Sequence, residues 1–348
     1  MRTPPQAASV QVDGPGELVA ALPHLLAFHP VDSLVALVLS DARPTRVVMS
    51  LRVDLPAPRH RRALAHQLLT PIRSEAGSVV LVVVGGGTPD PPGSLPHQGL
   101  IDCMESVLAT ADIRLAGAVW TSATTEGAQW IGYGDAGCTG TVPDPTGSEM
   151  AAACAAAGMI TFASRADLAA VLTPDDPEVL SRREALLDEA ALRAEGEQDR
   201  EQAARRGLLL VTRAVTNAHD RTTPLSDDDI VALTTALADL WVRDMSLVFA
   251  TGPHTAAAER LWTELTRATP VPERAQAATL LAFSAYLRGD GALASVALDQ
   301  AEEACPSHRL ASLVRCALDH ALPPDQVARM AMSPSSQPDW TPDGPLWP

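Results

Sequence analysis

The chain has 348 residues, of which 46% are hydrophobic and only 3% aromatic, and its formal net charge is −16 at pH 7. This length accommodates two domains of ordinary size, with cores built mainly from Ala, Leu and Val. The negative charge argues against a nucleic-acid partner and against binding to anionic membranes, because both repel an acidic protein. The chain contains no lysine, which excludes Schiff-base and lysine-nucleophile chemistry.

The five cysteines are scattered, and none forms a C-x-x-C pair. This pattern favours free thiols in a reducing compartment over a disulfide framework or a zinc site. The first residues lack the apolar core of a signal peptide, and no uncharged apolar run is long enough to span a bilayer. We therefore expect a soluble cytoplasmic protein without a metal, a cofactor, a nucleic-acid partner or a membrane partner.

The first part of the chain alternates between helix and strand patterns. In chain order, we predict helix Glu17–Phe28, strands Leu34–Leu39 and Arg46–Leu55, helix Arg59–Ser74, strand Val79–Val84, helix Gln98–Ala111, and strands Ile113–Thr121 and Gln129–Tyr133. Continuous apolar runs such as LVALVL are typical of strands buried on both faces. The short links Ser40–Thr45 and Ser122–Gly127 favour antiparallel hairpins. The sequence thus predicts an α/β domain with a mixed sheet over residues 10–145.

Gly134–Ser148 is rich in Gly, Pro, Thr and Asp and is predicted to be a linker. No strand pattern follows it. We predict helices over Ala151–Ala157, Arg165–Leu172, Glu178–Arg206 (one helix or a pair), Ile230–Leu240, Val242–Phe249, Ala256–Arg267, His308–Leu318 and Pro324–Met330. We expect an all-helical domain over residues 146–331 and a disordered tail over residues 332–348.

Within the helical domain, Ala278–Pro306 has the pattern of two short helices joined by the turn Gly289–Gly291. Small residues, Ala294 and Ala301, stand where two helices must approach closely. This stretch resembles one tetratricopeptide-type repeat, which is about 34 residues long. The resemblance implies a helix-packing surface that could bind a partner.

Several short motifs together resemble a bacterial family catalogued as domain of unknown function 4192. They are LAFHPVDSL at Leu26–Leu34, LRVDLP at Leu51–Pro56, WVRD at Trp241–Asp244, LAF at Leu281–Phe283 and RGDGALA at Arg288–Ala294. The resemblance extends over nearly the whole chain and implies no assigned reaction. In that family, neighbouring cysteines follow a Trp-containing strand, whereas here Cys138 alone follows Trp130, which argues against a metal role for this segment.

Polar residues gather where the first predicted helix meets the first strand. His29, Asp32 and Ser33 occupy this junction, and Arg52 and Asp54 end the neighbouring strand. An imidazole, a carboxylate and a hydroxyl can form an acid–base or nucleophilic set. Alternatively, they cap backbone groups at a turn. No G-x-S-x-G motif surrounds the serine, so we predict no catalytic residue and retain all five as candidate ligand-binding residues.

A basic cluster, Arg59–Arg62, begins the second predicted helix. Cations there oppose the helix dipole at a cost of about 0.3–1 kcal/mol each, which an anion bound at the free N–H groups would offset. Arg59, Arg61 and Arg62 are therefore candidate anion ligands, and the alternative is a solvated surface cluster. Gly85–Gly87 follows a buried strand, but nearby prolines prevent a helix from starting there. A connector at the strand ends is therefore favoured over a phosphate loop.

No catalytic constellation is recognisable, so our leading hypothesis is a non-catalytic interaction or scaffold protein that uses its helical domain. This domain would bind a protein partner or a second copy of the chain, although about three repeats are normally needed for a stable array. The alternative is a small-ligand-binding module, or an enzyme, with a polar pocket at the strand ends of the α/β domain.

Overall fold

The computed structural model describes residues 14–41, 45–75, 77–87, 94–134, 138–156, 159–195 and 199–331. These residues form two compact units, of which the first ends at Asp167 and the second begins at Leu168. The predicted domain boundary, between residues 145 and 146, precedes this division. The predicted tail over residues 332–348 lies outside the described residues. No helix in the described ranges is both long and apolar enough to cross a membrane.

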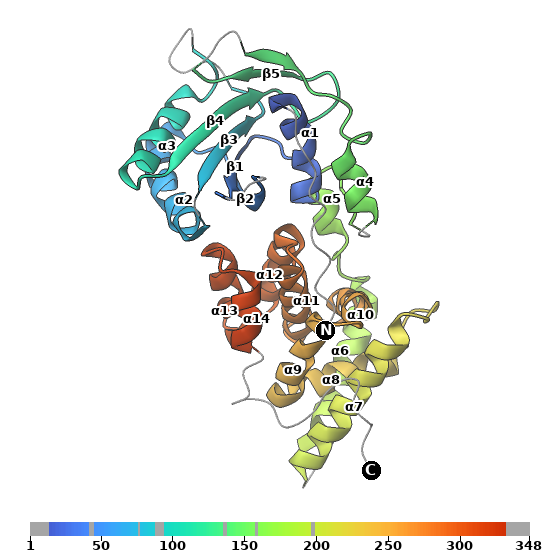
Figure 1. The fold of residues 1–348 in the computed structure, drawn as a ribbon. Helices are drawn as coiled ribbons and strands as arrows, with labels where there is room; N and C mark the ends of the chain where they lie inside the picture. Colours follow the sequence, from blue (N-terminus) through green and yellow to red (C-terminus); the bar gives the residue numbers. More distant parts are fainter. Residues whose placement is uncertain are drawn as a thin grey trace. The chain divides into compact units, whose positions relative to one another are not determined.

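The first unit contains a six-stranded sheet in the order β2-β1-β3-β4-β5-β6 (Figure 1). Its strands are β1 (Ser33–Leu39), β2 (Val47–Asp54), β3 (Ser78–Val84), β4 (Arg114–Thr121), β5 (Gln129–Gly132) and β6 (Thr139–Thr141). Strands β3 and β4 pair in parallel, whereas β1 pairs antiparallel with both β2 and β3. Strand β5 is antiparallel to β4 and to β6. The prediction of a mixed sheet with two hairpins is therefore confirmed.

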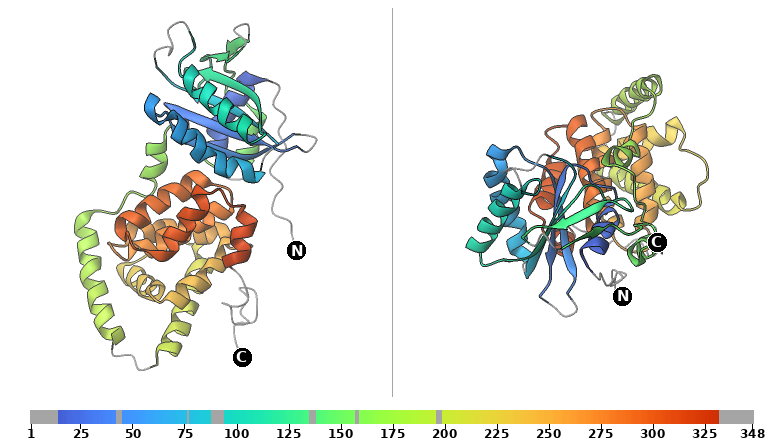
Figure 2. Two further views of the ribbon diagram at one scale, coloured as in Figure 1. Left: turned by 90° about the vertical axis from the view of Figure 1, so that its left-hand side faces the viewer. Right: turned by 90° about the horizontal axis from the view of Figure 1, so that it is seen from above.

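Helices cover both faces of this sheet. Helices α2 (Arg61–Glu75) and α3 (Gln98–Thr110) lie side by side on one face (Figures 1 and 2). Their apolar residues pack on the inward side chains of β1 and β3 to form the core of that face. Helices α1 (Pro15–Leu26) and α4 (Glu149–Ala156) lie on the opposite face (Figure 1). Strands β1 and β3 are therefore buried on both sides, as their continuous apolar runs indicate, whereas β2 is only partly buried.

Four strand ends meet at one edge of the sheet. Ser33, the first residue of β1, pairs with Asp54 at the end of β2 and with Val84 at the end of β3. Val84 in turn pairs with Thr121 at the end of β4. We call this the carboxyl edge, because three of the four strands end there.

The predicted linker Gly134–Ser148 is wrong in part, because β6 lies within it and extends the sheet. A Cβ added to Gly140 would lie only 2.8 Å from the ring of Trp130, so this short strand needs glycine where it crosses the indole. The segment before α5 (Arg165–Ala170) also belongs to the first unit. There Phe162 forms a parallel β-bridge with Phe28, and α4 packs against α1.

The second unit is helical throughout its described residues. Its helices are α6 (Pro177–Glu195), α7 (Arg200–Ala218), α8 (Asp227–Ala238), α9 (Leu240–Ser246), α10 (Thr255–Ala268), α11 (Arg274–Leu287), α12 (Gly291–Ala304), α13 (Arg309–Asp319) and α14 (Pro324–Ala331). A 3-10 turn at Leu247–Ala250 follows α9, and another, at Pro58–His60, precedes α2 in the first unit. Helix α7 continues beyond the predicted end at Arg206, because Leu208, Val211 and Val215 form a buried stripe.

Helices α11 and α12 form the predicted hairpin. Gly289 adopts a φ of +87° in the turn, and the Asp290 carboxylate accepts a hydrogen bond of 2.9 Å from the backbone N–H of Leu293, which caps α12. Ala294 and Ala301 are fully buried, as the close approach of two helices requires. The helical hairpin is thus present, and its tetratricopeptide character stays a prediction.

Candidate binding site at the carboxyl edge of the sheet

Three of the sequence-predicted residues form one chain of polar contacts at the carboxyl edge. The buried Ser33 hydroxyl donates to the carbonyl of Val31 at 2.6 Å and accepts from Nε of Arg52 at 2.8 Å. Nη2 of Arg52 lies 2.6 Å from Oδ1 of Asp54, whose side chain is exposed. The serine donates its proton to a carbonyl and has no neighbouring base. These contacts therefore hold the start of β1 in place and do not activate a nucleophile.

Asp32 serves the neighbouring turn. Its φ is +44°, and its Oδ1 accepts a hydrogen bond of 3.2 Å from the N–H of Gly86. Its carbonyl also accepts from the N–H of Leu55 at 3.0 Å, which ties the end of β2 to the same turn. A Cβ on Gly85 would lie 2.6 Å from Oδ1 of Asp32, so only glycine fits beside this aspartate.

The glycines after β3 are held on several sides. The N–H of Gly85 donates to the carbonyl of Thr121, and its carbonyl accepts from the indole N–H of Trp120 at 3.0 Å. The Nε2–H of His97 donates to the carbonyl of Gly86 at 2.9 Å. The N–H groups of Gly85 and Gly86, which a phosphate loop would offer to a ligand, are therefore already bonded to Thr121 and Asp32.

The basic cluster is spread over the surface at the start of α2. Arg59 and Arg62 are exposed, and Nε of Arg59 lies 3.2 Å from Nε2 of His60. Arg61 instead lies against α3, where a Cβ on Gly99 would be 2.7 Å from its Nη1. The structure therefore does not gather the three arginines around one point.

An open depression of about 480 Å³ lies beside the carboxyl edge, and it includes His29. Its lining comes from three segments that are distant in sequence: His29, Pro30 and Val31; Ala123, Thr124 and Thr125; and Thr161, Phe162 and Ala163. The first segment leads into β1 and the second follows β4. The third segment is bound to the first, because the His29 N–H donates to the Phe162 carbonyl at 3.2 Å. Asp32, Ser33, Arg52 and Asp54 do not line the depression.

The side chain of His29 is held by the hydroxyl of Thr124. Its Nδ1 lies 2.9 Å from the hydroxyl of Thr124, which is only 2% exposed. Burial lowers the pKa of His29, and the nearby imidazole of His24 lowers it further. Both effects favour the neutral imidazole.

A second imidazole–threonine pair adjoins the first. Nε2 of His24 lies 2.9 Å from the carbonyl of Pro145 and must carry a proton to donate to it. Nδ1 of His24 is then an acceptor, and it receives the hydroxyl proton of Thr161 at 2.8 Å. Sequence reasoning missed both threonines, because each contacts its histidine only after the chain has folded.

The arrangement is suited to binding. The described residues that line the depression include no charged side chain. The Thr124 hydroxyl is buried and bonded to His29, so it is not available to a substrate, and the described lining contains no carboxylate that could orient the imidazole for catalysis. Among the described residues, no group of three or more His, Cys, Asp or Glu side chains is placed to hold a metal ion.

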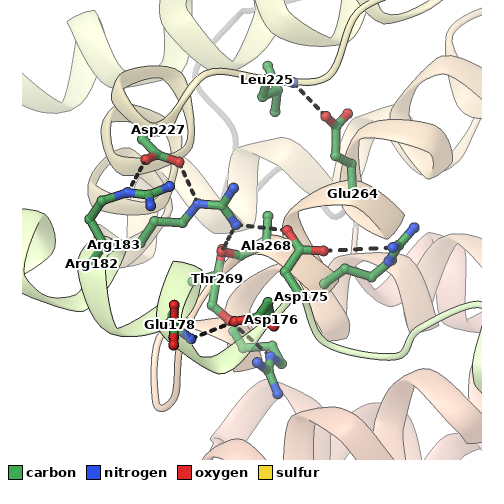
Figure 3. A network of polar contacts seen from close by, with 12 residues as sticks. Asp175, Asp176, Glu178, Arg182, Arg183, Leu225, Asp227, Glu264, Ala268 and Thr269 are labelled. Atoms are coloured by element: carbon green, nitrogen blue, oxygen red, sulfur yellow. Dashed lines mark hydrogen bonds and ion pairs between the residues drawn. The ribbon is translucent and has the colours of Figure 1, made fainter.

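The helical unit contains a separate cluster of charges around Arg183 (Figure 3). Arg183, 8% exposed, donates to Asp175 and Asp227 at 2.8 Å each and to the carbonyl of Ala268 at 2.9 Å. Hydrogen bonds from Arg182 and Arg183 lower the pKa of Asp227. This network joins α6 to the start of α8 and the end of α10.

A second ion pair strengthens the same region. Arg221 makes a bidentate salt bridge with Glu264. The Glu264 carboxylate also accepts a hydrogen bond of 2.7 Å from the backbone N–H of Leu225 (Figure 3). Because these charges neutralise one another, the cluster holds helices together and offers no charge to a ligand.

The family described as domain of unknown function (DUF4192) matches residues 15–325, and the chain belongs to this family. This confirms the family predicted from the short motifs. The searches found no match among curated proteins and none among solved structures.

Proposed function

We propose that this DUF4192 protein binds a small polar molecule in the depression lined by His29, Thr124 and Thr161, without transforming it. The observation that carries the proposal is the convergence of three distant segments on one open depression beside the carboxyl edge. Ligands of open α/β sheets bind beyond the carboxyl ends of the strands, which is where this depression lies. Its neutral imidazole and hydroxyl groups supply hydrogen bonds, and its volume accommodates a metabolite.

A thermal-shift screen of nucleotides, sugars, amino acids and their amides tests this proposal. A ligand present at one hundred times its dissociation constant should add about 2.7 kcal/mol to the stability of the protein. The stabilisation should disappear in His29→Phe, which removes the ring nitrogens at the depression. It should persist in the control Thr212→Val, which removes a buried hydroxyl bonded to its own helix. A ligand that stabilises both variants equally would place binding elsewhere and contradict the proposal.

The helical unit supports a second candidate function, protein–protein interaction. Helices α13 and α14 both pack on α11, yet they leave Leu313 and Met330 more than half exposed. Exposed apolar side chains mark contact sites for another protein where they form a contiguous patch. Leu313→Glu should then abolish a stoichiometric complex or a self-association seen by sedimentation of the wild-type protein. If the wild type sediments as a monomer and purifies from native lysate without a stoichiometric partner, this candidate fails.

A further inference from the structure

We infer that the depression takes an uncharged ligand that offers a hydrogen-bond acceptor to His29 and a donor to Thr161, as a carboxamide does. This inference rests on the proposed binding function and names its ligand class. It follows from the positions of the protons in the two imidazole–threonine pairs and from the absence of charge in the lining.

The hydrogen bonds of His24 fix what Thr161 can offer to a ligand. The carbonyl of Pro145 cannot donate, so the proton between it and His24 must reside on Nε2. In that tautomer, Nδ1 of His24 carries no hydrogen and accepts the hydroxyl proton of Thr161. The oxygen of Thr161 keeps both of its lone pairs, so Thr161 can offer a ligand only an acceptor.

The buried hydroxyl of Thr124 fixes the tautomer of His29. The hydroxyl of Thr124 is almost fully buried, and its partner is Nδ1 of His29. If the ring donated to the hydroxyl, the hydroxyl proton would remain buried without an acceptor, which is the costlier arrangement. The hydroxyl therefore donates to Nδ1, and the proton of the neutral ring resides on Nε2. His29 then offers a ligand an N–H donor.

The described lining of the depression is uncharged. The described side chains that line the depression are one imidazole, three threonine hydroxyls and apolar groups. A bound carboxylate or phosphate would find no cation there, and a bound ammonium would find no carboxylate. Partial burial of an unpaired charge is unfavourable, so the lining selects against both kinds of ion. An uncharged molecule loses only its hydrogen bonds to water, which His29 and Thr161 replace.

A carboxamide matches both groups. Its carbonyl oxygen accepts from Nε2 of His29, and its N–H donates to Oγ1 of Thr161. The exposed hydroxyl of Thr125 adds a group that can either donate or accept. Val31 and Phe162 supply apolar surface for the rest of the molecule. A carboxylate of the same shape lacks the donor and carries a charge that nothing in the lining balances.

Benzamide, benzoate and benzamidinium test the inference, because they have nearly the same shape and differ in charge. The full chain, labelled with ¹⁵N, is titrated with each at pH 7.5, and binding is followed at the amides of Thr125 and Ala163. We expect saturable shifts with benzamide and at least tenfold weaker binding of both ions. Thr161→Val should weaken benzamide binding at least tenfold, Thr161→Ser should restore it, and Thr212→Val should leave it unchanged.

The possible outcomes separate this inference from the proposed function. Equal or tighter binding of benzoate or benzamidinium at these amides would overturn the inference and leave the proposed function standing. If none of the three shifts these amides, the inference also fails. The proposed function then fails only if no compound of the broader thermal-shift screen shifts them either. The comparison of the three compounds uses the wild-type protein, so it does not depend on whether a variant folds.

Discussion

The side chain of His308 caps helix α13, and this role requires a neutral ring. Its Nδ1 accepts from the backbone N–H of Ala311 at 3.1 Å, while its Nε2 lies 3.0 Å from Oε1 of Gln276 and donates to it. Burial lowers the pKa of His308. The charge of Arg243 lowers it further, and Asp244 partly opposes this effect. Protonation would place a hydrogen on Nδ1, which could then no longer accept the hydrogen bond from the N–H of Ala311.

The stability of the protein should therefore depend on His308 at mildly acidic pH. Because the folded-state pKa lies below its ordinary value of 6.5, the unfolded state binds more protons as the pH falls. The contribution is fully present above pH 6.5 and is lost as the pH falls toward the folded-state pKa. His308→Asn keeps a capping side chain without a titrating group, so its urea unfolding should lose less stability between pH 7.5 and 5 than the wild type does.

An exposed histidine supplies the control for this measurement. His60→Asn changes an exposed histidine and should keep the wild-type dependence on pH. His308→Ala removes the cap and should cost about 0.5–2 kcal/mol at pH 7.5. Identical pH slopes for the wild type and His308→Asn would contradict the assignment of this cap.

At the scale of residues, the sequence could predict contacts between neighbouring strands but not contacts between distant turns. The hairpin pattern brings Arg52 and Asp54 beside Ser33, because antiparallel register follows from alternation and a short link. The partner of His29 is Thr124, which stands in the turn after β4, two positions from β1 in the sheet. A lone threonine in a polar turn carries no sequence signal for such a contact, so the depression emerged only from the fold.

At the scale of elements, the α11–α12 hairpin should depend on small residues at its contact. Ala294 is fully buried there, so Ala294→Phe would overfill the contact and should cost about 1–3 kcal/mol. Ala185→Phe introduces the same side chain at an exposed position of α6 and should change the stability by less than about 0.5 kcal/mol. Equal unfolding midpoints in urea for the two variants would contradict the packing described for this hairpin.

The elements that sequence reasoning missed share a physical cause. Strand β6 has only three residues, and its central Gly140 interrupts any alternation of apolar side chains. The second half of α7 follows a highly charged first half, so its buried stripe around Val211 is short. In both cases contacts made by the folded chain stabilise an element whose own pattern is too brief to detect.

At the scale of the whole molecule, the two compact units should respond separately to a change in one of them. Arg183→Met removes the cation shared by Asp175 and Asp227 and should destabilise the helical unit by about 1.5–3 kcal/mol. Arg182→Met, at a mostly exposed arginine that also pairs with Asp227, should cost about 1 kcal/mol or less.

Hydrogen exchange followed by mass spectrometry can assign this loss to one unit. In Arg183→Met, peptides from α6, α8 and α10 should exchange faster, whereas peptides from β1 and β3 should keep their wild-type protection. Faster exchange throughout the sheet would contradict the division at Asp167 and Leu168.

The order of architecture along the chain was predictable, because apolar runs of strand length stop where the Ala- and Leu-rich helical patterns begin. The extent of the first unit was harder to predict, since the bridge between Phe28 and Phe162 joins segments far apart in sequence. The same bridge brings Thr161 to the depression. The molecule's candidate site therefore depends on a tertiary contact that local patterns do not encode.

The most direct test of the account is the protonation state of His29, measured by long-range ¹H–¹⁵N spectra of the imidazole rings at pH 7.5. The account predicts a neutral ring that carries its proton on Nε2, with this nitrogen's resonance shifting when benzamide is added. A charged ring, a proton on Nδ1, or an Nε2 resonance that does not change at saturating benzamide would contradict it.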